Sequence, residues 1–164
     1  MALIDISSYK LDLIKDLIAS ETILTGIDSQ QADIHSPDDY IYKNIYPFAY
    51  LPDTETKSDT FILFFVDLPN INRQNPTFAD IRLTIWVLVH KDRQQMKEQN
   101  ASRADYLGEE IRKMLDGSKN YGYGVLDLVA SREVILNEKY VYRELIFRTV
   151  DMKMSSHNKV GRFS

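Results

Sequence analysis

The stretch FADIRLTIWVLVH, residues Phe78–His90, alternates more regularly than any other part of the chain. One parity is apolar throughout: Ala79, Ile81, Leu83, Ile85, Val87 and Val89. The other parity is mixed: Asp80, Arg82, Thr84, Trp86, Leu88 and His90. This period of two predicts a strand with one face on the core and one mixed face. Such a strand would span roughly 43 Å at about 3.3 Å per residue, so we expect it to overhang its sheet or to bend at a bulge.

Further strand-like segments lie on either side of this stretch. Residues 60–66, TFILFFV, are apolar on both parities, which predicts a central strand covered on both faces. Residues 129–136 and 140–150 are separated by a short polar turn and are predicted to form an antiparallel hairpin. Residues 40–51 are rich in aromatic side chains, which indicates an edge strand or extended segment whose rings pack over the sheet or in a subunit interface.

Two segments have the period of an amphipathic helix. The first begins at Ser7 or Ser8, either of which could be its N-cap, and continues to about Gly26. The second begins at Ser102, which has the spacing of a capping box, and ends at Gly117.

These segments together predict an α+β fold, a mostly antiparallel sheet with two helices packed on one face. Extended polar loops at residues 26–39, 67–76 and 91–100 project from this small sheet. We expect residues 1–151 to form a single α+β domain, because a chain of this length can bury one core. Residues 152–164 lack a core pattern and are predicted to be a flexible C-terminal tail or an arm that orders on a partner.

The composition excludes several classes of protein. The 164 residues contain no cysteine, which rules out a disulfide framework, a thiolate nucleophile, an iron–sulfur cluster and a cysteine-ligated zinc site. The 20 Lys and Arg against 24 Asp and Glu give a net charge of -4, so no overall positive field attracts nucleic acid or an anionic membrane. The longest apolar run has the length of a strand and the N-terminus has no basic start, so we expect neither a membrane span nor a secretory signal.

The sequence shows no pattern typical of a catalytic, cofactor or metal site. None of the three histidines has the spacing of a metal-ligand pair: His35, His90 and His157. The glycines of residues 121–124 do not match a phosphate-binding loop. We therefore expect no enzymatic activity, cofactor or metal, and the alternative in that class is a small hydrolase using His35, Asp38 or Asp39.

The remaining signal is that of an interaction surface. Trp86 lies on the mixed parity of the long strand near Arg82 and Leu88, and aromatic and Arg side chains often anchor interfaces. Long loops and an unpatterned tail are extensions by which an assembly subunit reaches its neighbours. We predict subunit or partner contacts at the following residues: Arg82, Trp86, Leu88, Asn70, Asn72, Arg73, Arg132, Tyr140, Tyr142 and Arg148.

Six segments follow one another in a characteristic order. An N-terminal helix precedes IYPFAY, TFILFFV, ADIRLTIWVLVHKD, RADYLGEEIRKMLDG and VASREVILNEKYVYRELIFRTVDM. This order, which covers most of residues 3–151, resembles the tail terminator and tail completion proteins of tailed bacteriophages. The resemblance implies a structural virion protein that forms a ring, usually a hexamer, at the head-proximal end of the tail tube. Such a ring stops tube polymerisation and joins the tail to the head connector.

The same resemblance implies the partners and the location. The partners would be further copies of the chain, the tail tube protein and a head–tail connector or stopper protein, with no membrane involved. Phage DNA would pass through the channel without specific binding, which suits an acidic subunit. The protein would reside in the virion at the head–tail interface after assembly in the cytoplasm of the host bacterium.

Other functions are compatible with the same pattern. Within the assembly class, the chain could be a head-completion stopper or a tail tube subunit, and stoichiometry separates these because a tube subunit polymerises. Outside that class, a non-viral adaptor or ligand-binding domain would remain monomeric, with the aromatic side chains of residues 40–50 lining a pocket.

Overall fold

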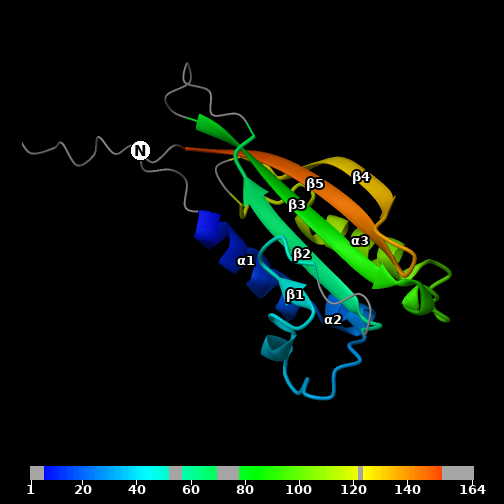
Figure 1. Ribbon diagram of the computed structural model, residues 1–164. Coiled ribbons are helices and arrows are strands. Elements are labelled where there is room, and N and C mark those ends of the chain that lie inside the picture. Colours follow the sequence, from blue (N-terminus) through cyan, green and yellow to red (C-terminus); the bar gives the residue numbers. More distant parts are fainter. Residues whose placement is uncertain (1–5, 52–56, 70–77, 122–123, 153–164) are drawn as a thin grey trace, which may run out of the picture.

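The computed structural model describes residues 6–51, 57–69, 78–121 and 124–152. Within these ranges the chain forms a five-stranded sheet and three α-helices (Figure 1). The elements in chain order are α1 (Ile6–Ala19), α2 (Glu21–Ile27), the 3-10 turn η1 (Pro37–Tyr40), β1 (Ile45–Tyr46), β2 (Thr60–Asp67), β3 (Phe78–His90), the 3-10 turn η2 (Lys91–Arg93), α3 (Arg103–Leu115), β4 (Asp127–Ile135) and β5 (Tyr140–Met152).

The strands are arranged in the order β1-β2-β3-β5-β4. β1 pairs with β2 in parallel, and the pairs β2–β3, β3–β5 and β4–β5 are antiparallel. Figure 1 shows β3 and β5 running side by side through the middle of the sheet, with β4 outside β5. The predicted α+β class with a mostly antiparallel sheet is confirmed.

The long strand predicted over Phe78–His90 has those bounds in the structure, as β3. β5 pairs with β3 over the whole length of both strands. β2 pairs with β3 only as far as the Asp67–Arg82 pair, so the first four residues of β3 lie beyond the end of β2. The long strand therefore extends past β2, although β5 accompanies it to its end. A register shift is found in β4, between Leu128 and Ala130, and not in the long strand.

The helices pack against one face of the sheet, where they form the main core. The apolar parity of β3 faces this core, as the alternation predicts. The strands contribute Ile62, Phe64, Leu83, Ile85, Val87, Val89, Leu145 and Phe147. The helices contribute Leu13, Leu17, Ile23, Leu24, Ile27, Ala104, Leu107, Ile111 and Leu115. Full burial of a Val, Leu, Ile or Phe side chain in this core stabilises the fold by roughly 1.5–3 kcal/mol.

The prediction of one helix from Ser7 or Ser8 to Gly26 is wrong, because the chain breaks at Ser20 and forms α1 and α2. Ser20 is extended, with φ -87° and ψ 100°, and its side chain accepts a hydrogen bond from the Ile23 N–H at 3.3 Å. Three helices therefore pack on the sheet where two were expected. Both helices on either side of the break direct apolar side chains into the same core, Leu13 and Leu17 from α1 and Ile23, Leu24 and Ile27 from α2.

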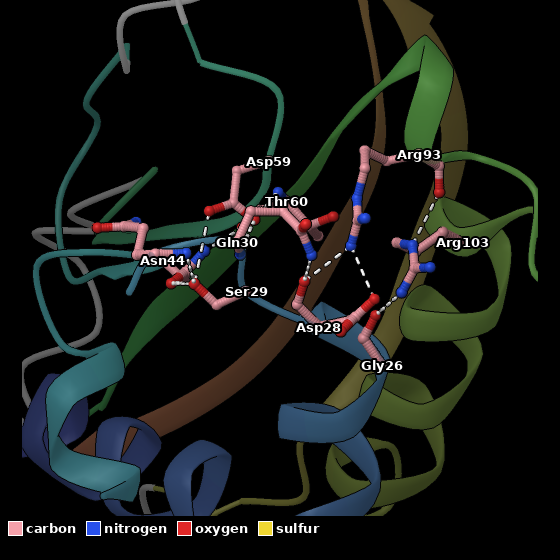
Figure 2. Close-up of polar contacts among 10 residues, drawn as sticks. Gly26, Asp28, Ser29, Gln30, Asn44, Asp59, Thr60, Arg93 and Arg103 are labelled. Atoms are coloured by element: carbon pink, nitrogen blue, oxygen red, sulfur yellow. Dashed lines mark hydrogen bonds and ion pairs between the residues drawn. The ribbon is translucent and has the colours of Figure 1, made fainter. Parts of the chain in front are cut away.

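The loop between α2 and β1 is held by buried polar side chains (Figure 2). Asn44 is fully buried, and its Nδ2 donates to the Thr60 carbonyl at 2.8 Å. Ser29 Oγ donates to Asn44 Oδ1 at 2.8 Å. The buried Asp59 carboxylate accepts the Thr60 N–H at 2.8 Å and the Gln30 N–H at 3.4 Å. These bonds fix the loop to the start of β2 and satisfy polar groups that burial would otherwise leave unpaired.

The remaining predicted elements are found close to their expected positions. α3 is capped by Ser102, whose Oγ accepts the Asp105 N–H at 3.2 Å, and the chain leaves it through Gly117 at φ 79°. The hairpin is formed by β4 and β5, and the edge strand in the aromatic segment is β1. β5 continues to Met152, the first residue of the predicted tail, and residues 153–164 lie outside the described residues.

The cap at Ser20 gives the first test. We expect Ser20→Ala to lower the free energy of unfolding by about 1 kcal/mol, because the Ile23 N–H loses its acceptor. Chemical denaturation measures this difference. Ser20→Asn is the matched control and should keep most of the stability, since Asn also caps helices. Equal stability of Ser20→Ala and the unchanged chain would contradict a capping role.

Candidate interaction surface

The sheet face opposite the helices carries most of the described residues that the sequence assigns to contacts. The even-numbered residues of β3 and β5 lie on this helix-free face, because the odd-numbered residues of both strands face the main core. A smaller cluster covers one end of the helix-free face. Its members are Tyr46, Phe61, Leu63, Leu88 and Tyr140, with Trp86, Leu136 and Tyr142 packed against them.

Trp86 is held in the middle of the helix-free face by three contacts. Its ring lies 4.8 Å from the Tyr142 ring at an interplanar angle of 32°, and 5.6 Å from the Phe65 ring at 87°. Its indole Nε1–H donates to Glu144 Oε2 at 2.7 Å. Glu144 lies directly opposite Trp86 in the β3–β5 ladder, so the bond joins cross-strand neighbours. The indole of Trp86 is therefore fixed in orientation while the residue remains partly exposed.

Glu144 also binds Arg132 on the neighbouring strand β4. Arg132 Nε donates to Glu144 Oε1 at 2.6 Å. The Arg132 side chain is 65% exposed, whereas that of Glu144 is 9% exposed. One buried carboxylate therefore positions both an aromatic and a cationic side chain. A charge-assisted hydrogen bond of this kind is stronger than a neutral one, although solvent reduces its contribution on the Arg132 side.

The other end of the helix-free face is charged. Arg82 contacts Asp67 through two nitrogens, with Nε–Oδ1 at 3.1 Å and Nη2–Oδ2 at 3.2 Å. Arg148 lies directly opposite Arg82, and its Nη2 is 3.3 Å from Asp80 Oδ2. Two like charges opposite each other would destabilise the ladder, so the acidic partner of each arginine offsets that repulsion.

The structure brings five of the predicted contact residues onto one face: Arg82, Trp86, Arg132, Tyr142 and Arg148. It places two others inside the protein, since Leu88 is 1% exposed and Tyr140 is fully buried. Both pack with Phe61, so in this structure their side chains contact the protein's own core. The three predicted contacts of the loop lie outside the described residues: Asn70, Asn72 and Arg73.

Sequence reasoning missed Glu144, which organises the centre of this face. The sequence does contain a signal for Glu144. It is the one acidic residue on the face of β5 that also carries Tyr140, Tyr142 and Arg148. An acid among aromatic side chains in a strand indicates a buried carboxylate with a cationic or N–H partner. The identity of those partners depends on the register between neighbouring strands. The alternation within a single strand does not predict that register.

A second exposed surface lies at the β1 edge of the sheet. We name Tyr42, Phe48, Tyr50 and Leu51 the edge aromatic patch, and all four are exposed. Phe48 lies 6.0 Å from the Tyr42 ring and 5.9 Å from the Tyr50 ring. Tyr50 in turn stacks at 4.6 Å on Tyr46. Burial raises the pKa of the Tyr46 phenol, and the nearby Tyr50 and Asp59 raise it further. The patch itself consists of aromatic and aliphatic side chains only.

The residues of the alternative hydrolase have local roles in the structure. Asp39 Oδ2 accepts the backbone N–H of His35 and of Ser36, both at 2.8 Å, and these bonds lower the pKa of Asp39. Asp39 thus caps the turn η1. In the part of the chain that the structure describes, no group of three or more His, Asp or Glu side chains is placed to hold a metal ion. None of the helices in the described ranges is long and apolar enough to cross a bilayer.

This geometry defines the chain as an α+β protein with one sheet face covered by its own helices and the other bearing fixed aromatic and arginine side chains. A family model named YomW matches residues 11–149, and the chain belongs to the YomW family. The family is phage-derived and Bacillus phage SPBeta-like, so the chain is a phage-related protein. A search of curated proteins finds no match.

The role of Glu144 gives a test with a local readout, because Trp86 is the single tryptophan of the chain. We expect Glu144→Ala to destabilise the fold by about 1–3 kcal/mol and to shift the Trp86 emission to longer wavelength, since the indole N–H loses its buried acceptor. Fluorescence during denaturant unfolding measures both effects.

Two further variants complete this experiment. Glu144→Gln should leave the emission wavelength of Trp86 close to that of the unchanged protein, because an amide oxygen can still accept the indole hydrogen bond. Glu133→Ala is the control, since Glu133 is an exposed residue of β4 whose side chain makes no hydrogen bond to the described residues. An unchanged emission in Glu144→Ala would refute the positioning role.

Proposed function

We propose that this chain is a structural virion protein of the phage neck, a tail terminator that forms a ring, caps the tail tube and joins it to the head connector. Membership of a phage-derived family supports the viral context of this proposal. The order of the elements along residues 3–151, which resembles that of tail terminators, supports the particular role.

The observation that carries the proposal is that the two edges of the sheet differ. One edge is the short strand β1, which is joined to the edge aromatic patch. The other is β4, whose outer edge has no strand partner among the described residues and whose Val129 and Ile135 are exposed. A ring with head-to-tail contacts needs two different patches on each subunit, so that every copy offers one patch and accepts the other.

The helix-free face adds a third contact surface. Trp86, Tyr142 and Arg132 are of the residue types that dominate binding energy in interfaces, and their contacts with Glu144 hold them in place. We assign this face, with Arg82 and Arg148, to subunit contacts or to contacts with the tail tube protein and the connector or stopper. The loop of residues 67–76 and the arm of residues 153–164 would extend these contacts.

The net charge of -4 fits a channel through which DNA moves. A strongly basic lumen would bind the phosphate backbone and slow its passage, whereas an acidic subunit does not. We therefore expect no specific binding of DNA. The assembled protein would lie at the head–tail interface of the virion, after assembly in the cytoplasm of the host bacterium.

Light scattering over a concentration series tests the assembly state. We expect a closed oligomer of about six subunits, because heterologous contacts that close a ring stop at a fixed number. Open-ended polymers would contradict the terminator role in favour of a tail tube subunit. A monomer that also fails to bind purified phage tails would overturn the whole proposal and favour an adaptor domain.

A charge reversal tests the contact surface. Arg82→Glu should raise the dissociation constant of the oligomer roughly tenfold, because it replaces a positive charge on the proposed contact face by a negative one and leaves Asp67 unpaired there. Lys15→Glu makes the same charge change on α1, on the opposite side of the sheet, and should leave assembly unchanged. Thermal unfolding of both variants checks that the subunit remains folded. Equal assembly of the two variants would remove Arg82 from the interface.

A further inference from the structure

Arg103, at the start of α3, is a buried cation without an acidic partner. The residue is 8% exposed. Its Nε donates to the Arg93 carbonyl at 2.8 Å, and its Nη1 donates to the Gly26 carbonyl (Figure 2). Both acceptors are neutral, and no described carboxylate lies within ion-pair distance of the guanidinium. Buried charges are costly unless an opposite charge compensates them, so this arrangement is unusual for a purely structural arginine.

The acidic groups near Arg103 already have other partners. Asp28 binds the neighbouring Arg93, with Nη2–Oδ2 at 2.8 Å. The Asp59 carboxylate accepts backbone N–H groups of Gln30 and Thr60 (Figure 2). Burial lowers the pKa of Arg103, and the charge of Arg93 lowers it further. Asp28 and Asp59 act in the opposite direction from a distance, so the charge of Arg103 is balanced only in part and no carboxylate binds the guanidinium directly.

Arg103 also lines a hollow of about 430 Å³ on the surface. The hollow lies between the end of α2, the loop after η2 and the first turn of α3. The residues that line it with Arg103 are Thr25, Gly26, Asp28, Gln95, Met96, Lys97, Glu98, Gln99 and Tyr106. Nη2 is the guanidinium nitrogen of Arg103 that has no acceptor among the described residues, and Figure 2 shows it without a bond.

The backbone N–H groups in the first turn of α3 already have acceptors and are not free to bind a ligand in this hollow. The Asp105 N–H is bound to Ser102 Oγ at 3.2 Å, and the Ala104 N–H is 3.3 Å from Gln94 Oε1. The Arg103 N–H donates to the Gln94 carbonyl at 2.7 Å. An anion in the hollow would therefore be bound by the Arg103 side chain and not by the helix terminus.

We propose that this hollow binds the carboxylate of an acidic side chain on a partner protein. The lining carries two cations, Lys97 and Arg103, and two carboxylates, Asp28 and Glu98. Because Asp28 is paired with Arg93 from outside the lining, the remaining charges favour a ligand with a single negative charge. A planar guanidinium matches a carboxylate in geometry, and a carboxylate in the hollow would supply the missing counter-charge.

The lining also fits the rest of an acidic side chain. Met96 and Tyr106 offer apolar surface for an aliphatic stem, while Lys97 is an exposed second cation. Asp28 and Glu98 would repel the second charge of a phosphate dianion. The hollow is formed by one chain, so binding of a carboxylate there does not depend on ring formation.

The test is a titration of the full chain, followed by NMR of the arginine Nε–H groups. Arg103 is assigned by the signal that Arg103→Lys removes. We expect the blocked tripeptide acetyl-Gly-Glu-Gly-amide to shift this signal in a saturable way, with a dissociation constant on the order of millimolar. The matched tripeptide acetyl-Gly-Gln-Gly-amide should leave it unchanged at the same ionic strength.

A substitution of Arg103 would also remove its hydrogen bonds within the fold, so two lysine variants test the site without changing those bonds. Lys97→Gln should weaken binding of the Glu tripeptide about threefold, because Lys97 is exposed and contributes only its charge. Lys119→Gln removes the same charge from an exposed residue beyond the other end of α3 and should have no effect. Equal weakening by both variants would indicate attraction at long range and would overturn the site.

Other outcomes also decide against the proposal. Equal shifts with the Glu and Gln tripeptides would show that charge is not recognised. The absence of a saturable shift would show that the hollow binds no carboxylate. Saturation by inorganic phosphate at lower concentration than by the Glu tripeptide would replace the proposal with a free phosphate site.

Discussion

The ladder between β3 and β5 determines most of the structure, because it fixes which side chains share a face. A slip of one residue would turn the apolar parity of β3 toward solvent and remove Leu83, Ile85 and Val87 from the core. The same register sets Trp86 opposite Glu144. Burial of the core face fixes the register of β3 and β5. The same register determines which side chains are neighbours on the helix-free face.

The sequence predicts the elements that depend on local signals. The alternation of residues 78–90 predicts β3 with its bounds, and Ser102 predicts the start of α3. The break at Ser20 could not be predicted from periodicity, because apolar side chains continue on both sides of it. Its cause is a cap whose benefit appears only when α1 and α2 both reach the core.

The candidate surface was only partly predictable, for a different reason. Parity places Trp86 and Leu88 on one face, yet Trp86 stays partly exposed while Leu88 is covered by the cluster that contains Tyr46. Tyr46 belongs to β1, and its pairing with Leu63 of β2 is a parallel contact between segments that the chain joins by a long connection. Such coverage is a property of tertiary packing, which no single strand encodes.

The uncovered surfaces of this protein are ordered by buried polar groups in two different ways. At Glu144, the buried carboxylate has its partners within the chain, so Trp86 and Arg132 are held in place before any partner arrives. Pre-ordered side chains lose little entropy on binding, which favours a rigid contact surface. At Arg103, the guanidinium binds only carbonyl oxygens of the chain and no carboxylate directly. The carboxylate of Glu144, whose partners lie in the same chain, stabilises the free subunit. The guanidinium of Arg103, which binds no carboxylate, would gain one in a complex. The two sites together suit a protein that folds alone and acts through its neighbours.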